Sequence, residues 1–398
     1  MRFSRRSCAV ALLLALAGAA GAAGAAGAAT MTYKVLLLEP ADDPRLERSV
    51  VERAYLGHAT GPAFDGLDVA VKEAQFELDA AGVAVTLERQ AVADAAAARD
   101  AASRAQKAGV SAIVADLPDD ALLAAADATP LPVLDVGAAA DRLREGDCRA
   151  RVLHLLPSER MRADALAQTL VARRWSSVLL LAGPSALDAQ RSAVAQAAIK
   201  RYGLKLLQVK PFKLSADPRE RDLANPLLLT GTASTGSYDV VWVVDSDGEF
   251  ARSLPYRTAL PRPVVGDAGL VALAWAAQFE RFGAPQVSRR FARAAGRAMT
   301  ANDWAAWMAG KAIAAAAVAA PKGPATALAK ALPALELDGS KGTPLTFRAW
   351  DGQLRQPMLL TDGQGVIALA PADGVLHPKN NLDTLGADAP EKLCKARP

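Results

Sequence analysis

Histidine, cysteine and paired acidic residues are the groups that could do chemistry in this 398-residue sequence, and they are few. The three histidines, His58, His154 and His377, lie far apart in the chain and offer little acid–base chemistry at neutral pH. The sequence contains no G-x-S-x-G, H-E-x-x-H or P-loop motif and no adjacent cysteine–histidine pair. We therefore expect a protein that is not an enzyme and that needs no cofactor.

Acidic residues and cysteines suggest two further sites. Asp245, Ser246 and Asp247 resemble the start of a calcium loop, but the later ligands of an EF-hand do not follow. We interpret this segment as a solvated turn and expect no metal site. Cys148 and Cys394 could form a disulfide in an oxidising compartment, and the sequence leaves their pairing open because it does not give the distance between them.

Residues 1–29 have the composition of a secretory signal peptide. Arg2, Arg5 and Arg6 precede an uncharged apolar stretch, and a Gly/Ala run then provides small-residue cleavage sites. Without this segment the chain has 43 basic and 42 acidic residues, so it lacks the basic surface of a nucleic-acid-binding protein. No later segment has the roughly twenty consecutive apolar residues that a spanning helix needs. We expect an exported periplasmic protein that neither binds nucleic acid nor inserts into a membrane.

Two successive series of strand and helix patterns must position the remaining residues. Apolar runs such as 33–38 and 178–181 are typical of buried strands, and striped segments such as 64–80 and 159–173 are typical of helices. The strand at 151–155 is expected to open the second series, and short strands around Asp-Gly turns end the chain. This alternation predicts an α/β fold of two Rossmann-like lobes.

The order of these elements resembles the type I periplasmic solute-binding proteins of the branched-chain amino-acid transporter class. The resemblance rests on residues 151–210, on the helix that begins near Trp304 and on the closing segment 341–353. Residues 52–58, 76–82 and 377–380 further resemble a subfamily associated with PQQ-dependent alcohol dehydrogenases. The family implies lobes joined by a multi-strand hinge, with lobe 1 at 32–147 and 268–337, lobe 2 at 148–267 and 338–375, and a tail at 376–398.

The binding cleft should lie where loops follow the strands of both lobes, because ligands of open parallel sheets bind at the carboxyl ends of the strands. The candidate ligand-binding residues in these loops are Tyr55, His58, Gly137, Ala138, Ala139, Ser185, Asp245 and Asp267. Tyr55 could instead cover a sheet edge, and His58 could instead cap a turn.

The resemblance also assigns roles within the cleft. Hydroxyl side chains and backbone amides at 137–140 would bind an α-carboxylate, but the residues here are glycine and alanine, so only the amides remain. Asp267 would bind an α-ammonium group, whereas the aromatic residue expected near Ser185 is missing. These departures argue against a branched-chain amino acid and suggest a small alcohol-derived or otherwise less polar ligand.

The expected function is therefore that of the periplasmic substrate-binding component of an ABC transporter. It would deliver a small solute to an inner-membrane permease, and the subfamily resemblance implies a periplasmic PQQ dehydrogenase as a further partner. The alternative is a ligand-binding accessory or sensor protein of a periplasmic dehydrogenase system, without a role in transport.

Overall fold

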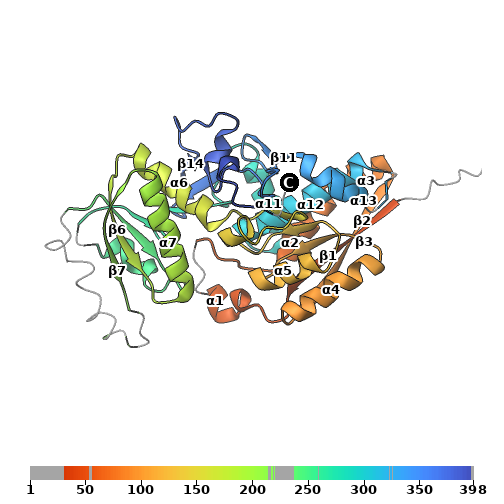
Figure 1. The fold of residues 1–398 in the computed structure, drawn as a ribbon, viewed down its shortest axis with the longest axis horizontal. Coiled ribbons are helices and arrows are strands. Elements are labelled where there is room, and N and C mark those ends of the chain that lie inside the picture. The colour runs from red at the N-terminus through yellow and green to blue at the C-terminus, as the bar shows by residue number, and fades with distance from the viewer. Residues whose placement is uncertain are drawn as a thin grey trace, which may run out of the picture.

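The computed structural model describes residues 31–52, 56–213, 217, 219, 237–258, 260–321, 323–324 and 326–395. Two lobes lie next to each other, each built on a parallel sheet of its own (Figure 1). The predicted two-lobed α/β fold is confirmed. The predicted signal peptide and Tyr55 lie outside the described residues.

The first lobe contains a five-stranded sheet whose pairings are all parallel. In spatial order its strands are β2 (Val83–Val92), β1 (Met31–Pro40), β3 (Val110–Ala115), β4 (Val133–Asp135) and β5 (Val152–His154). Successive side chains of β1 enter two different cores, Val35 and Leu37 on one face and Leu36 and Leu38 on the other. Burial on both faces explains why this strand is a continuous apolar run.

Helices cover both faces of this sheet. One face carries α2 (Ala63–Glu73), α3 (Gln75–Ala81), α11 (Ala284–Ala295), α12 (Ala301–Ala319) and α13 (Thr326–Ala331), and the other carries α4 (Ala95–Lys107) and α5 (Asp119–Asp127). The short helix α1 (Arg48–Glu52) follows β1. The late segment that forms α11 to α13 thus returns to complete the core of the first lobe.

The second lobe contains a four-stranded parallel sheet. Its strands in spatial order are β7 (Lys205–Pro211), β6 (Ser177–Ala182), β8 (Val240–Val244) and β9 (Val264–Gly266), with helices α6 (Glu159–Ala172) and α7 (Ala186–Arg201) on one face. Ser158 accepts a hydrogen bond from the amide of Met161 and caps α6, as its position before the helix predicts.

One strand that the sequence assigns to the second lobe belongs to the sheet of the first. The sequence predicts that the strand at 151–155 opens the second lobe, but β5 pairs with β4, with Val152 opposite Val133. The chain crosses to the second lobe only after His154. A short apolar run specifies a buried strand but not the sheet it joins, so the pattern alone could not decide between the lobes.

Several strands connect the two lobes. The backbone amide of His154 donates to the oxygen of Gly352 in the closing segment, and the backbone oxygen of His154 accepts from the amide of Leu354 in the same segment. Nearby, β10 (Val271–Leu273), β13 (Met358–Thr361) and β14 (Val366–Ala370) form an antiparallel sheet that packs against α6. The small hairpin of β11 (Glu336–Asp338) and β12 (Pro344–Thr346) lies between β10 and β13 in the sequence.

The C-terminal tail is attached to the second lobe. The backbone amide of Gly386 donates to Asp164 on α6, and Leu385 lies in the core of that lobe. Cys394 forms a disulfide with Cys148, which lies between β4 and β5. The sequence leaves the pairing of these two cysteines open, and the structure shows that they are paired. The disulfide fixes the tail beside the crossing between the lobes.

Candidate functional site

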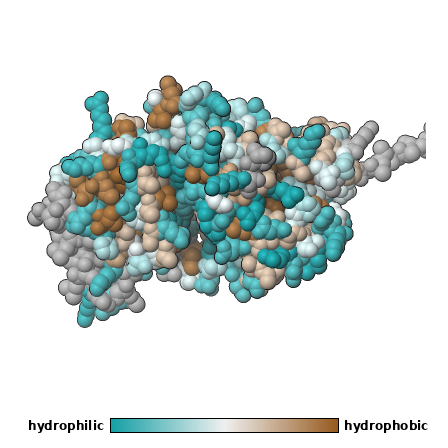
Figure 2. Space-filling view, in the orientation of Figure 1, coloured by the Kyte–Doolittle hydropathy of each residue, from teal (hydrophilic) through white to brown (hydrophobic). Residues whose placement is uncertain are grey.

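The candidate site lies between the lobes, where Figure 2 shows a furrow in the surface. From the first lobe, the loop containing Gly57 and His58 reaches the second lobe. A methyl group on Gly57 would lie 3.3 Å from Nη2 of Arg162 and 3.1 Å from Cδ2 of Leu273. A ligand between these segments would contact both lobes.

The first-lobe loop after β4 does not offer the amides that the sequence predicts for a ligand. Oδ1 of Asp135 accepts hydrogen bonds from the amides of Gly137 and Ala138, at 3.1 and 2.9 Å. Its Oδ2 lies 2.7 Å from Nδ1 of His154, which is buried in the core. An internal carboxylate therefore takes the place that a ligand carboxylate would occupy on these two amides. In the same loop, Ala139 accepts from the amide of Glu159 and thereby joins the lobes.

A second buried acid lies at the end of the neighbouring strand. Asp116 follows β3, and its Oδ2 accepts from Arg45 at 2.9 Å, while Arg45 also binds Asp43. Among the described residues, Oδ1 of Asp116 has no hydrogen-bond partner. Burial raises the pKa of Asp116 to about 6, although Arg45 opposes that shift. Asp116 thus forms a charged cluster with Asp43 and Arg45 beside the loop after β4.

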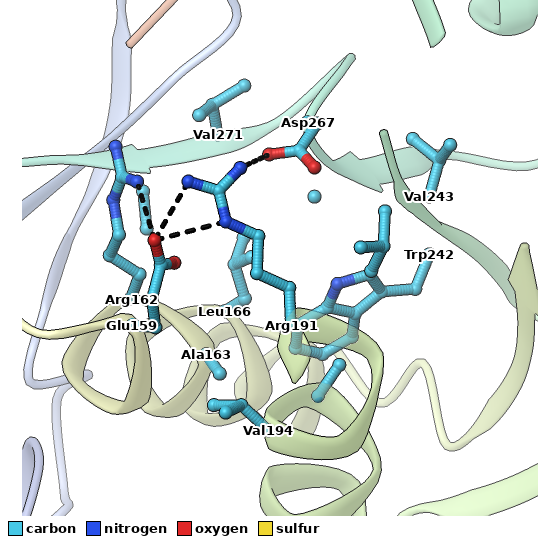
Figure 3. A pocket seen from close by; sticks show the side chains of 14 residues that line it. Glu159, Arg162, Ala163, Leu166, Arg191, Val194, Trp242, Val243, Asp267 and Val271 are labelled. Atoms are coloured by element: carbon cyan, nitrogen blue, oxygen red, sulfur yellow. Dashed lines mark hydrogen bonds and ion pairs between the residues drawn. The ribbon is translucent and has the colours of Figure 1, made fainter. Parts of the chain in front are cut away.

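A pocket opens on the second-lobe side, at the carboxyl ends of β8 and β9 (Figure 3). Its polar rim is a chain of charges in the order Arg162, Glu159, Arg191 and Asp267. Arg191 donates two hydrogen bonds to Oε1 of Glu159, at 2.8 and 3.1 Å, and lies 3.9 Å from Oδ1 of Asp267. Glu159 therefore engages Nε and Nη2 of Arg191, whereas Nη1 makes the longer contact with Asp267.

The interior of this pocket is apolar. It lies between α6, α7 and the sheet, and it is lined by Ala163, Leu166, Val194, Ala195, Trp242, Val271 and Ala272. The free space is about 50 Å³, which holds a few water molecules or a small alkyl group. A charged rim above an apolar interior can orient a small amphiphilic ligand.

Asp267 lies on the rim, as its predicted role requires, but it already has partners. Its Oδ2 accepts from the backbone amide of Asp245 at 2.8 Å, and its side chain is 26% exposed. Burial raises the pKa of Asp267 to about 6, and the nearby Arg191 limits the shift. Asp267 therefore positions Arg191 and the loop after β8.

Arg162 is the least engaged cation of the rim. Among the described residues its side chain forms one ion pair, with Glu159 at 3.8 Å, and 24% of it is exposed. The loop of Gly57 and His58 approaches this arginine from the first lobe. Burial, and then the charges of Arg191 and Arg162, lower the pKa of His58 to about 4, and Asp247 only partly offsets them.

The other predicted site residues have structural roles. Ser185 caps α7, accepting from the amide of Asp188, and its hydroxyl lies 3.1 Å from that of Ser246. Asp245 is fully buried and accepts from the amide of Ala251, so it holds its own loop together. The structure therefore places Asp267 at the second-lobe pocket and His58 in the loop that approaches its rim, whereas Gly137, Ala138 and Ala139 lie in the first-lobe loop after β4.

Sequence reasoning missed Glu159, Arg162 and Arg191 because it searched the loops that follow strands. Glu159 and Arg162 lie in the first turn of α6 and Arg191 in the second turn of α7, and both helices start at the same edge of the sheet. The available signal was the spacing of Glu159 and Arg162, three residues apart directly after the helix cap at Ser158. The polar rim therefore comes from helix starts as much as from loops.

Comparison with known sequences finds no matching family model and no matching curated protein. Solved structures do match. A branched-chain amino acid ABC transporter periplasmic ligand-binding protein from Burkholderia xenovorans LB400 is 15% identical, with 92% of this chain and 99% of that chain covered and a TM-score of 0.70.

Two further solved structures are complexes with a ligand. An ABC transporter substrate-binding protein from Desulfitobacterium hafniense, in complex with leucine, is 16% identical over 84% of this chain and 98% of its own, with a TM-score of 0.64. A solute-binding protein of an ABC transporter from R. palustris, in complex with benzoate, is 13% identical over 85% and 96%, with a TM-score of 0.61. These similarities show that the chain has the fold of the two-lobed periplasmic binding proteins.

Within the described part of the chain, no helix is both long and apolar enough to cross a membrane. The same residues contain no group of three or more histidine, cysteine, aspartate or glutamate side chains that could hold a metal ion.

Proposed function

We propose that this protein is the substrate-binding component of an ABC transporter, which binds a small solute between its lobes and delivers it to an inner-membrane permease. The observation that carries the proposal is the approach of the Gly57–His58 loop to Arg162 of the other lobe, beside a pocket. A solute that contacts both lobes favours the closed arrangement, because its affinity is greater for that state. The likeness to transporter binding proteins over 92% and 84% of the chain supports the same function.

The first experiment is thermal unfolding of the protein without residues 1–29, against amino acids, short alcohols, carboxylates and amides. A ligand at about 100 times its Kd adds roughly 2.7 kcal/mol of stability, which gives a measurable rise in Tm. With any ligand that raises Tm, small-angle scattering should show a smaller radius of gyration for the protein than without the ligand. Binding without closure, or no binding by any compound, would contradict the proposal. Turnover of a compound would point to an enzyme instead.

Asp267→Ala is the first variant to combine with this assay. Removing the carboxylate leaves Arg191 without one partner and frees the amide of Asp245. Ligand affinity should therefore fall while the apo protein stays folded, as its circular dichroism would show. An unchanged Kd would remove Asp267 from the binding machinery.

Export to the periplasm and the link to PQQ-dependent alcohol oxidation are parts of the same proposal. The export signal is supported by residues 1–29, and the link by residues 52–58, 76–82 and 377–380. A strain that lacks this gene should lose uptake of the solute. If the link holds, it should also grow more slowly on the alcohol that induces its PQQ dehydrogenase. Normal uptake with impaired alcohol oxidation would favour the accessory role over transport.

A further inference from the structure

A larger cavity lies beside the antiparallel sheet of β10, β13 and β14. Its free space is about 690 Å³, which is within the range of small-molecule binding sites. It is lined by the end of α6, by residues 278–281 and by the segment from β14 to Asp373. It shares no lining residue with the pocket beside Asp267. We call this cavity the β14 groove.

The β14 groove runs along the free edge of its strand. The consecutive residues 366–369 all line it, and successive residues of a strand point to opposite faces of a sheet, so the cavity must follow the edge. β14 is the last strand of its sheet, and within the described part of the chain its backbone pairs only with β13. Such an edge presents unpaired N–H and C=O groups to which an extended chain can bind.

The two walls of the groove lie on opposite faces of this sheet. Leu360 of β13 belongs to the core that contains α6, which packs against β14 (Figure 1), whereas the neighbouring Leu359 belongs to the core that contains Phe279. A strand added to β14 would direct alternate side chains toward Ala172 of α6 and toward Phe279. The groove therefore suits an extended chain with small apolar side chains.

Charges of both signs line the same groove. Arg173 and Arg281 are cationic, Glu280 and Asp373 are anionic, and none of the four forms an ion pair with another described residue. A lining with both kinds of available charge is complementary to a molecule that carries one ammonium and one carboxylate group. The unpaired edge and these charges together match a short peptide whose two termini are free.

We propose that the β14 groove binds a short free peptide, which adds to β14 as an extended strand and pairs its termini with the charges of the lining. β14 is five residues long, so a peptide of about five residues can pair along it. The arginines bind the terminal carboxylate, and Glu280 or Asp373 binds the terminal ammonium group. This site is separate from the solute pocket, so the inference goes beyond the proposed transport function.

Hydrogen–deuterium exchange tests the strand pairing, with a pentapeptide of alternating valine and threonine as the probe. At about 1 mM, which saturates a site of micromolar Kd, the peptide should slow amide exchange in residues 364–370 by at least about fivefold. The same peptide with N-methylated amides lacks the donors and should slow nothing. Unchanged exchange in this segment, or equal slowing by both peptides, would overturn the proposal and leave the solute-binding function untouched.

Calorimetric titration tests the role of the termini. The uncapped peptide should bind about fivefold more tightly than its acetylated and amidated form, as two exposed ion pairs would give. Arg173→Gln combined with Arg281→Gln should abolish this preference. The matched control is Arg104→Gln, which removes an exposed cation from α4 and should preserve it.

The comparison of capped and uncapped peptides on wild type decides the question even where the double variant does not fold. A capped peptide that binds as tightly as the uncapped one would overturn the free-peptide ligand and indicate an internal segment of a partner protein instead. An uncapped preference that survives in the folded double variant would overturn the role of the two arginines.

Discussion

At the scale of single residues, Asp135 determines what the first lobe can bind. Its two oxygens hold the amides of Gly137 and Ala138 and the imidazole of His154, all in a buried setting. A carboxylate supplied by the chain thus fixes a loop that otherwise could bind a carboxylate from a ligand. The loop on this side of the cleft is therefore held by an internal interaction that the sequence pattern does not reveal.

Replacement of this carboxylate should be costly. Asp135→Asn keeps one oxygen acceptor but presents an NH₂ group in place of the other, so it should lower the free energy of unfolding by about 1.5–3 kcal/mol. Urea denaturation measures the effect. Asp127→Asn is the control, since Asp127 forms only an exposed ion pair with Arg149 and should cost less than about 1 kcal/mol. Equal costs for the two variants would contradict the role given to Asp135.

Asp116 should make stability depend on pH. Its pKa is about 6 in the folded protein, raised mainly by burial, and near 3.8 when the chain is unfolded. The folded state therefore holds more protons between these values, so its stability falls as the pH rises from about 4 to 6, by up to roughly 1.4 kcal/mol per unit of pKa shift.

Asp116→Asn tests this dependence. Wild type should lose more unfolding free energy than the variant when the pH is raised from 4.5 to 7, measured by urea denaturation at both values. The variant lacks the contact with Arg45 at both pH values, so the loss of this contact does not affect the difference between them. Parallel losses in the two proteins would show that Asp116 does not titrate in this range.

At the scale of elements, two glycines allow α2 and α12 to pack closely. A methyl group on Gly66 would lie 2.2 Å from the backbone oxygen of Asp303, and one on Gly310 would lie 2.6 Å from Cβ of Ala70. Alanine would favour the helix by about 1 kcal/mol, but the overlap with backbone should outweigh this gain.

Gly66→Ala should therefore lower Tm by several degrees, as a loss of about 1–3 kcal/mol does in a chain of this size. Gly146→Ala is the matched control, because a methyl group there meets no atom within 4 Å and its backbone has no positive φ. Differential scanning fluorimetry compares the two. If the Gly66→Ala protein has the same Tm as wild type, the two helices can move apart without loss of stability.

The sequence predicts most elements of this fold, and its failures have physical reasons. Continuous apolar runs locate β1, β3, β6 and β8, because strands buried on both faces need apolar side chains at successive positions. The sheet to which β5 belongs depends on tertiary pairing and could not be read from three residues. Likewise, Asp267 could be located from its strand, whereas the contacts of Glu159 and Arg191 depend on how two helices pack.

At the scale of the whole molecule, the crossing segments and the tail meet at one place. Gln356 donates to the backbone oxygen of Leu155, and Arg348 donates to backbone oxygens of Leu382 and Leu385 in the tail. Because these bonds link the crossing to the closing segment and the tail, the closure that we propose should occur by small changes around this hydrogen-bonded centre. The disulfide is part of this centre.

Reduction of the disulfide should therefore destabilise the whole protein. The bond joins residues 246 apart in the sequence, and loss of such a cross-link typically costs about 2–5 kcal/mol, because the unfolded chain regains its freedom. Reductant should lower the Tm of wild type but not that of a variant with both Cys148→Ser and Cys394→Ser, whose Tm should match that of the reduced wild type. The tail should also become accessible to protease near residue 386, where its amide contact with Asp164 holds it. A wild-type Tm and cleavage pattern that do not respond to reductant, once thiol labelling shows both cysteines free, would mean that the tail is held by its polar contacts alone.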